Sequence, residues 1–192
     1  MAGKTQVRKI VVAGALGALS IALSLTPLGY IPWLAGASLT VMHVPAIIGA
    51  VLEGPIVGMI VGGIFGVSAL VKAATAPQGY IDPFFVNPLV SVLPRLLIGI
   101  VAWLVYRAFR GTHAAVAASV AGMAGSLANS FFVLGALVLF GAIQPAVAAS
   151  VLVSNSLIEA ALAAVLTLGV VAAWKGIESS TGKAKLAKED QP

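Results

Sequence analysis

The chain contains no cysteine, and that absence excludes several kinds of site at once. Without thiols there is no disulfide framework, no thiolate metal site and no cysteine nucleophile. Histidine is almost as scarce, because only His43 and His113 occur and no HExxH spacing is present. A metal site would therefore lack ligands, and we expect neither a metal nor a cofactor.

Charged residues are also few. They make up 9% of the 192 residues, whereas hydrophobic residues make up 60%, and a soluble domain is about one quarter charged. No charged residue occurs between Lys9 and Glu53 or between Gly111 and Glu159. A membrane span needs roughly 20 apolar residues, so these stretches hold several spans. Alternation of the kind that marks barrel strands is missing, and we expect an all-α integral membrane protein.

Motifs for energy coupling and catalysis are missing as well. There is no GxxxxGK[ST] sequence, so the chain has no P-loop for ATP hydrolysis, and no GxSxG sequence. We find no inverted repeat that relates the first three expected helices to the last three, which disfavours a secondary transporter. The net charge of +5 comes without a basic patch interleaved with aromatics. It indicates a membrane surface rather than nucleic acid.

Proline and glycine breaks divide the apolar sequence into six expected transmembrane helices. Their approximate bounds are Ile10–Leu25, a segment within Trp33–Leu52, Pro55–Ala74, Asn87–Phe109, Thr112–Phe140 and Pro145–Trp174. The second helix is the least regular, because Pro32 and Pro45 crowd its first turns. We expect residues 1–175 to form one six-helix domain and residues 176–192 to form a polar cytoplasmic tail.

The placement of Lys and Arg predicts the orientation. Nine of the eleven basic residues fall on one side if six spans alternate: Lys4, Arg8, Lys9, Arg107, Arg110, Lys175, Lys183, Lys185 and Lys188. This side is expected to be cytoplasmic, with both termini inside the cell and the chain in the plasma membrane. Lys72 and Arg95 depart from the rule.

Small residues recur at four-residue spacing on two expected helices. One ladder is Gly54, Gly58, Gly62 and Gly66, and another set is Ala13, Gly14, Gly17, Ala18 and Ala22. Such stripes let helices approach closely in a bilayer. For the first ladder we expect packing within the chain. For the second, internal packing and docking of another membrane subunit both remain open.

Polar side chains occur at matching depths on three expected helices. They are Asn87, Ser91 and Arg95 on the fourth, Ser126, Asn129 and Ser130 on the fifth, and Ser154, Asn155, Ser156 and Glu159 on the sixth. At 1.5 Å per residue, Arg95, Asn129 and Asn155 lie about 12–16 Å below the outer ends of their helices. Polar groups are costly in lipid, so we expect them to face a small-molecule pocket that opens outward. The alternative is an Arg95–Glu159 ion pair that holds the bundle together.

Two further residues are candidates for the mouth of this pocket. His43 precedes Pro45 near the outer end of the second expected helix, and it either bonds within the fold or lines the pocket. Trp33 lies in an outer loop, where an aromatic side chain anchors at the interface or covers the pocket.

Four segments carry a resemblance to a known family. They are TVMHVPAIIG from Thr40, EGP from Glu53, GGIFGVS from Gly62 and FVNPLVSVLPRLLIG from Phe85. Together they resemble the substrate-binding S components of energy-coupling factor (ECF) vitamin transporters, and the pantothenate-type branch in particular. The resemblance extends from about Val11 to Trp174.

This resemblance implies a six-helix subunit that binds a vitamin in an outward cavity. It also implies association with a transmembrane coupling protein and two cytoplasmic ATPases, with cargo released inside. The coupling-protein positions map onto Ala13, Gly14, Gly17, Ala18 and Ala22, where glycine replaces the usual alanine twice. An anionic vitamin such as pantothenate suits Arg95, while cobalamin, folate or pyridoxine remain open. A stand-alone permease and an intramembrane enzyme using Glu159 or His43 are the rival functions.

Overall fold

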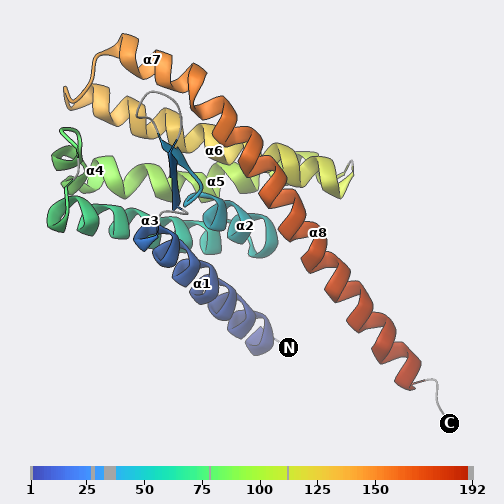
Figure 1. Cartoon of the computed structure of the whole chain (residues 1–192). Coiled ribbons are helices and arrows are strands. Elements are labelled where there is room, and N and C mark those ends of the chain that lie inside the picture. Colours follow the sequence, from blue (N-terminus) through green and yellow to red (C-terminus); the bar gives the residue numbers. More distant parts are fainter. Residues whose placement is uncertain (1, 27–28, 33–37, 78, 112, 190–192) are drawn as a thin grey trace.

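Helices run through nearly the whole chain and lie side by side as a bundle (Figure 1). The computed structural model describes residues 2–26, 29–32, 38–77, 79–111 and 113–189. The elements, in chain order, are α1 (Ala2–Leu25), β1 (Tyr30–Pro32), β2 (Ser38–Thr40), α2 (Val44–Glu53), α3 (Pro55–Thr75), η3 (Asp82–Val86), α4 (Pro88–Ser91), α5 (Leu93–Phe109), α6 (Ala114–Leu139), α7 (Pro145–Ser154) and α8 (Ser156–Glu189).

Five helical stretches among the described residues are long and apolar enough to cross a membrane. They are Gln6–Leu25, Pro55–Thr75, Pro88–Phe109, Ala114–Leu139 and Pro145–Gly176. Helix α2 is apolar too, but its 10 residues extend only about 15 Å. The predicted all-α membrane bundle is therefore confirmed, although its second helix is shorter than a membrane span.

The short α2 follows from the segment that precedes it. Strands β1 and β2 pair antiparallel, with Tyr30 opposite Thr40, and β2 uses residues of Trp33–Leu52, the segment in which the second helix was expected. A helix begins only at Val44, after His43, and its second residue is Pro45, where the missing N–H costs nothing. It ends at Gly54, whose φ of 98° favours glycine.

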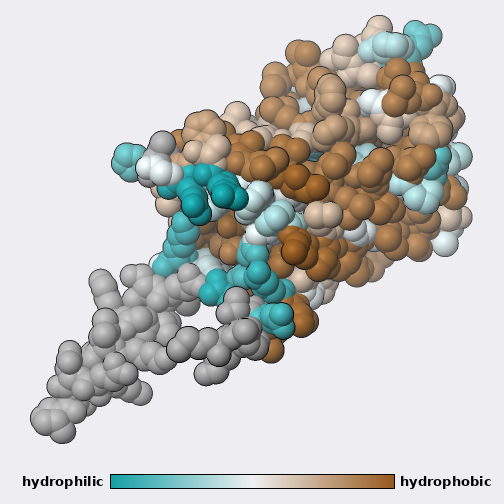
Figure 2. All heavy atoms as spheres, turned by 180° about the vertical axis from the view of Figure 1, so that it is seen from behind, coloured by the Kyte–Doolittle hydropathy of each residue, from teal (hydrophilic) through white to brown (hydrophobic). Residues whose placement is uncertain are grey.

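The outer surface of the bundle is apolar (Figure 2). Large hydrophobic side chains such as Ile56, Phe131 and Val153 are each more than 60% exposed. A soluble monomer rarely exposes wide apolar patches. Lipid acyl chains are the solvent that this surface fits, and the chain is a multi-pass membrane protein.

The glycine ladder of α3 lets α5 approach closely. A Cβ added at Gly62 would lie in severe conflict with the Arg95 carbonyl, and one added at Gly58 would lie 2.9 Å from the Gly99 Cα. Gly66 faces Ser91 and Val92 in the same way. Gly58, Gly62 and Gly66 therefore pack within the chain, as expected, and this packing fixes the backbone that carries Arg95, whereas nothing lies within 4 Å of a Cβ added at Gly54.

Two contacts of basic residues lie at the end of the bundle where α1 begins, and they involve Arg8 of α1 and Lys175 of α8. Arg8 Nε lies 2.6 Å from Glu53 Oε1 and its guanidinium lies over the Trp174 ring. Lys175 Nζ donates to the Tyr106 hydroxyl at 2.9 Å. Arg8 of α1 is thus paired with Glu53 at the α2–α3 junction, and Lys175 of α8 with Tyr106 of α5.

Two of the expected helices differ from their predicted form. The fourth is divided into α4 and α5 at Val92, because Pro94 lacks the N–H that a continuous helix would use. The sixth is divided into α7 and α8 at Asn155. Helix α8 also continues to Glu189, through the segment expected to be a polar tail. Its Ala, Lys and Glu residues are strong helix formers.

Candidate functional site

A cavity of about 170 Å³ lies within the bundle, where β2, α3, α5, α6, α7 and α8 meet. Its lining is a mixture of polar and apolar residues: Thr40, Met42, Phe65, Arg95, Asn129, Ser130, Val133, Leu134, Val151, Asn155, Ser156 and Glu159. Polar groups from α5, α6 and α8 converge there, as their depths along the helices predicted. A small number of convergent polar groups within a largely apolar wall is typical of a small-molecule site.

Glu159 is the acidic residue of this cavity and is 5% exposed. Its Oε1 accepts hydrogen bonds from the Thr40 amide at 2.5 Å and from Asn155 Nδ2 at 3.4 Å. Its Oε2 lies 3.5 Å from the Ser130 hydroxyl. Uncharged donors, rather than Arg95, therefore hold the Glu159 carboxylate.

Arg95 is the basic residue of the cavity and is 6% exposed. One guanidinium nitrogen, Nη1, donates to the Val90 carbonyl at 2.6 Å. The guanidinium carbon lies 5.3 Å from the Phe65 ring centroid and 5.2 Å from that of Phe85. Two aromatic faces and one carbonyl thus fix a desolvated cation at the cavity wall, where its attraction for an anion is strong.

Asn129 supplies a hydrogen-bond acceptor to the same cavity. Its Oδ1 is buried and has no hydrogen-bond donor among the described residues. A buried acceptor without a donor costs about 1–3 kcal/mol. A ligand with an N–H or O–H group at this position would remove that cost.

Three other predicted site residues, Asn87, Ser91 and His43, lie outside the cavity wall. The Asn87 side chain caps α4 by accepting from the Leu89 amide at 3.0 Å, and the Ser91 hydroxyl donates to the Phe85 carbonyl. Both therefore shape the η3–α4 turn, which carries Phe85 to the Arg95 guanidinium. His43 is fully buried, and neither of its ring nitrogens has a hydrogen-bond partner among the described residues. Trp33 lies outside the described residues.

Sequence reasoning missed part of the lining. Thr40 and Met42 reach the cavity because the β1–β2 hairpin folds over the bundle, and Phe65 reaches it from α3. No pattern in the local sequence predicts that these three residues line the cavity. Ser130 and Ser156 also line the cavity, and both belong to the polar set that the sequence predicted to face it.

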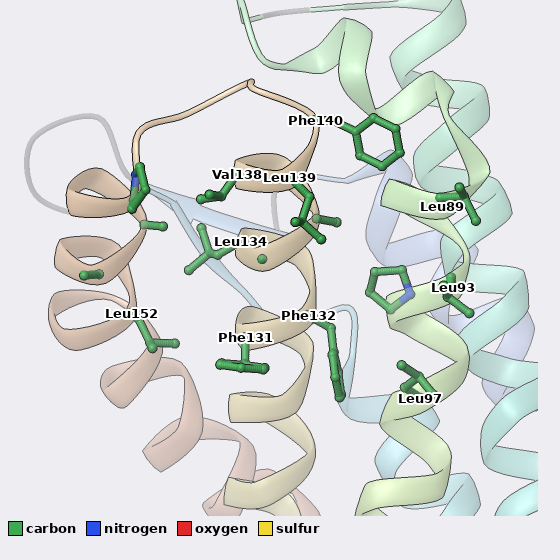
Figure 3. A pocket seen from close by; sticks show the side chains of 16 residues that line it. Leu89, Leu93, Leu97, Phe131, Phe132, Leu134, Val138, Leu139, Phe140 and Leu152 are labelled. Atoms are coloured by element: carbon green, nitrogen blue, oxygen red, sulfur yellow. The ribbon is translucent and has the colours of Figure 1, made fainter.

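A second, larger hollow adjoins this cavity. It has a volume of about 700 Å³ and lies between α5, α6 and α7, walled by side chains such as Leu93, Leu97, Phe132 and Leu152 (Figure 3). Its lining is almost wholly apolar, which makes it a lipid-facing groove rather than a site for a polar molecule. Leu134 lines both hollows and separates them.

The small residues of α1 divide between two faces. Ala13 and Gly17 are buried, and a Cβ added at Gly17 would lie 2.5 Å from Ile64 Cδ1 of α3. Gly14, Ala18 and Ala22 are exposed, and nothing lies within 4 Å of a Cβ added at Gly14. The first pair packs within the chain, and the other three form a smooth stripe on the surface.

Comparison with known proteins points to one family. The family model described as "ECF transporter, substrate-specific component" matches residues 8–171. A relative named pantothenic acid transporter PanT, from Lactococcus lactis subsp. cremoris, is 27% identical over 154 residues, which are 70% of this chain and 76% of that protein. The pantothenate transporter PanT of Leuconostoc mesenteroides is 34% identical over 77 residues, which cover 38% of each chain.

The matched region includes part or all of each of the five spanning helices and every residue that lines the polar cavity. The chain belongs to the family of substrate-specific components of ECF transporters.

Proposed function

We propose that this chain binds pantothenate in the polar cavity and delivers it to an ECF-type importer. The observation that carries the proposal is the position of Arg95 in the cavity wall, buried and held by Phe65 and Phe85. A buried arginine fits a carboxylate through charge-assisted hydrogen bonds. Two relatives whose names specify pantothenate support the choice.

The rest of the cavity suits the remainder of that vitamin. Pantothenate carries one amide and two hydroxyl groups beside its carboxylate. The Asn129 acceptor fits a ligand O–H or N–H group, and Met42 and Val133 provide apolar surface for its dimethyl carbon.

The rival vitamins fit less well. A cavity of about 170 Å³ lies below the 300–1,000 Å³ of sites for drug-sized ligands. Cobalamin and folate are too large for a cavity of this volume. Pyridoxine has no carboxylate that could pair with Arg95.

Energy for transport is supplied by partners in this proposal. The sequence has no P-loop, and the exposed stripe of Gly14, Ala18 and Ala22 offers a helix of a coupling protein close approach. Two cytoplasmic ATPases complete the assembly. The basic end with both termini faces the cytoplasm, so the hairpin end captures cargo outside.

Equilibrium binding to the purified chain tests the ligand. A panel of pantothenate, pyridoxine, folate and cobalamin is titrated, and we expect saturable binding of pantothenate alone. Tighter binding of another vitamin, or of none, would reject the assignment. Uptake by cells that lack every coupling-protein gene would instead indicate a stand-alone permease.

A further inference from the structure

The charges in the wall of the polar cavity balance each other before any ligand binds. Arg95 and Glu159 are both buried there, and the other lining residues that the structure describes are uncharged. Residues 27–28 and 33–37, which the structure does not describe, include no charged side chain in the sequence. The vitamin-free cavity therefore holds one positive and one negative side chain and is neutral as a whole.

A bound vitamin carboxylate changes this balance. The inference rests on the proposed function, in which the carboxylate of pantothenate pairs with Arg95. A carboxylate is ionised at neutral pH, so the complex would hold two negative charges and one positive charge. An uncompensated charge inside a membrane is costly. One further positive charge is therefore expected to enter the cavity with the vitamin.

The two oxygens of the Glu159 carboxylate differ in their surroundings. Oε1 accepts from the Thr40 amide at 2.5 Å and from Asn155 Nδ2 at 3.4 Å, and neither N–H group can accept a proton in return. Oε2 lies 3.5 Å from the Ser130 hydroxyl. A hydroxyl group donates to an ionised carboxylate and accepts from a protonated one. Both protonation states of Glu159 are therefore compatible with the same neighbours, and Oε2 is the oxygen that can take a proton.

Other titratable groups close to Glu159 are few. The side chains that α3, α6, α7 and β2 contribute to the wall are apolar, hydroxyl or amide groups, and Arg95 of α5 stays protonated at any physiological pH. His43 directly precedes α2, which packs against α8, and follows Met42 of the wall, but it does not itself line the cavity. His43 is the alternative proton acceptor that a test has to separate from Glu159.

We infer that one proton binds at Glu159 Oε2 together with the vitamin, so that the complex regains the neutrality of the vitamin-free cavity. The proton comes from the solvent and forms an O–H bond at Oε2, and no bond of the vitamin breaks. The Thr40 amide continues to donate to Oε1, so the hairpin keeps its position. A multivalent metal ion would meet a single carboxylate here, since no cluster of three or more His, Cys, Asp or Glu side chains occurs among the described residues.

The inference predicts a pH dependence with a definite sign. Where Glu159 is ionised in the vitamin-free protein and protonated in the complex, the proton acts as a second ligand. The affinity for pantothenate then falls as pH rises, by about tenfold per pH unit. Pantothenol, which carries an alcohol in place of the carboxylate, leaves the cavity neutral and is expected to bind with the same affinity across this range.

Isothermal titration calorimetry of the full purified chain counts the protons. Pantothenate is titrated at about pH 8 in two buffers of different ionisation enthalpy, and the difference in the observed heat gives the number of protons taken up. We expect about one proton per bound pantothenate and none per bound pantothenol. Saturable pantothenate binding without proton uptake would overturn this inference and leave the proposed function intact. Absence of pantothenate binding would overturn both.

Two variants assign the proton to a residue, and each is first shown to be monodisperse. Glu159→Gln keeps an oxygen for the Thr40 amide and directs an N–H group at Ser130, whereas alanine would also release the hairpin. We expect this variant to bind pantothenate without proton uptake and with an affinity that does not change with pH. His43→Gln is the control and is expected to take up about one proton, as wild type does.

Two further results would overturn the inference. One is proton uptake that persists in Glu159→Gln, which would place the proton elsewhere, and its loss in His43→Gln would identify the histidine. The other is a pantothenate affinity that rises when sodium chloride replaces choline chloride at the same pH and ionic strength. A sodium ion would then supply the compensating charge.

Discussion

The backbone amide of Thr40 donates to Glu159 Oε1 at 2.5 Å, which ties β2 to α8 across 119 residues of sequence. Thr40 and Glu159 both line the polar cavity. The contact therefore does two things: it satisfies a carboxylate buried in the membrane and it holds the hairpin against the cavity wall.

Removing this carboxylate is predicted to weaken vitamin binding. A hydrogen bond to a charged group contributes about 1.5–3 kcal/mol, so Glu159→Ala should lower pantothenate affinity by tenfold or more. The loss should appear mainly in the dissociation rate, measured by ligand release. Ser154→Ala is the matched control, since Ser154 is exposed and its hydroxyl donates to the Ser150 carbonyl one turn earlier in its own helix. Equal dissociation rates for the two variants would refute the role.

A substitution at Asn129 is predicted to weaken vitamin binding without lowering the stability of the vitamin-free protein. Asn129→Leu removes a buried acceptor that has no donor among the described residues. We predict about tenfold weaker pantothenate binding together with an unchanged or higher denaturation temperature of the vitamin-free protein. A lower denaturation temperature with unchanged affinity would show that Asn129 serves the fold instead.

The contact between α3 and α5 is predicted to be intolerant of a single methyl group. Gly62→Ala places a Cβ against the Arg95 carbonyl, and overpacking of this kind costs about 1–3 kcal/mol. The denaturation temperature should fall by several degrees, and affinity should fall with it because Arg95 moves. Gly14→Ala is the control, because nothing lies within 4 Å of its added Cβ. A Gly62→Ala protein with wild-type stability would contradict the described packing.

The exposed stripe of α1 is predicted to serve transport without serving binding. Gly14→Leu should leave pantothenate affinity unchanged and should lower uptake strongly in cells that have the coupling module, because the bulky side chain keeps a partner helix away. Gly169→Leu, the same change at an exposed glycine of α8 with nothing within 4 Å of its added Cβ, should transport normally. Wild-type uptake by the Gly14→Leu variant would show that the stripe is not part of the interface with the coupling protein.

Much of this fold follows from the sequence because its breaks have physical causes. The Gly54-Pro55 pair begins α3 at the expected residue, and α3 ends at Thr75, one residue beyond the expected Ala74. Counting 1.5 Å per residue placed Arg95, Asn129 and Asn155 at nearly one level and Glu159 one turn deeper, and all four line the cavity. Depth is predictable here because the spans share the two surfaces of one membrane.

The remaining features depend on tertiary packing. The hairpin brings Thr40 to Glu159 through a pairing of short strands that no alternation of hydrophobic residues marks. Asn87 and Ser91 share a helical face with Arg95 in sequence, yet Pro94 divides α4 from α5 and their side chains bond locally instead. Phe65 lies in α3, where the recognisable sequence pattern is the glycine ladder, and no pattern predicts that this aromatic residue lines the cavity.

The pairing of Arg95 with a ligand carboxylate is the central claim, and one measurement tests it most directly. Wild type and Arg95→Ala are each titrated with pantothenate and with pantothenol, which carries an alcohol in place of the carboxylate. We predict that wild type prefers pantothenate by tenfold or more, and that Arg95→Ala binds both weakly and without preference. Equal affinity of wild type for the two ligands, or an Arg95→Ala protein that keeps the preference for pantothenate, would contradict the account.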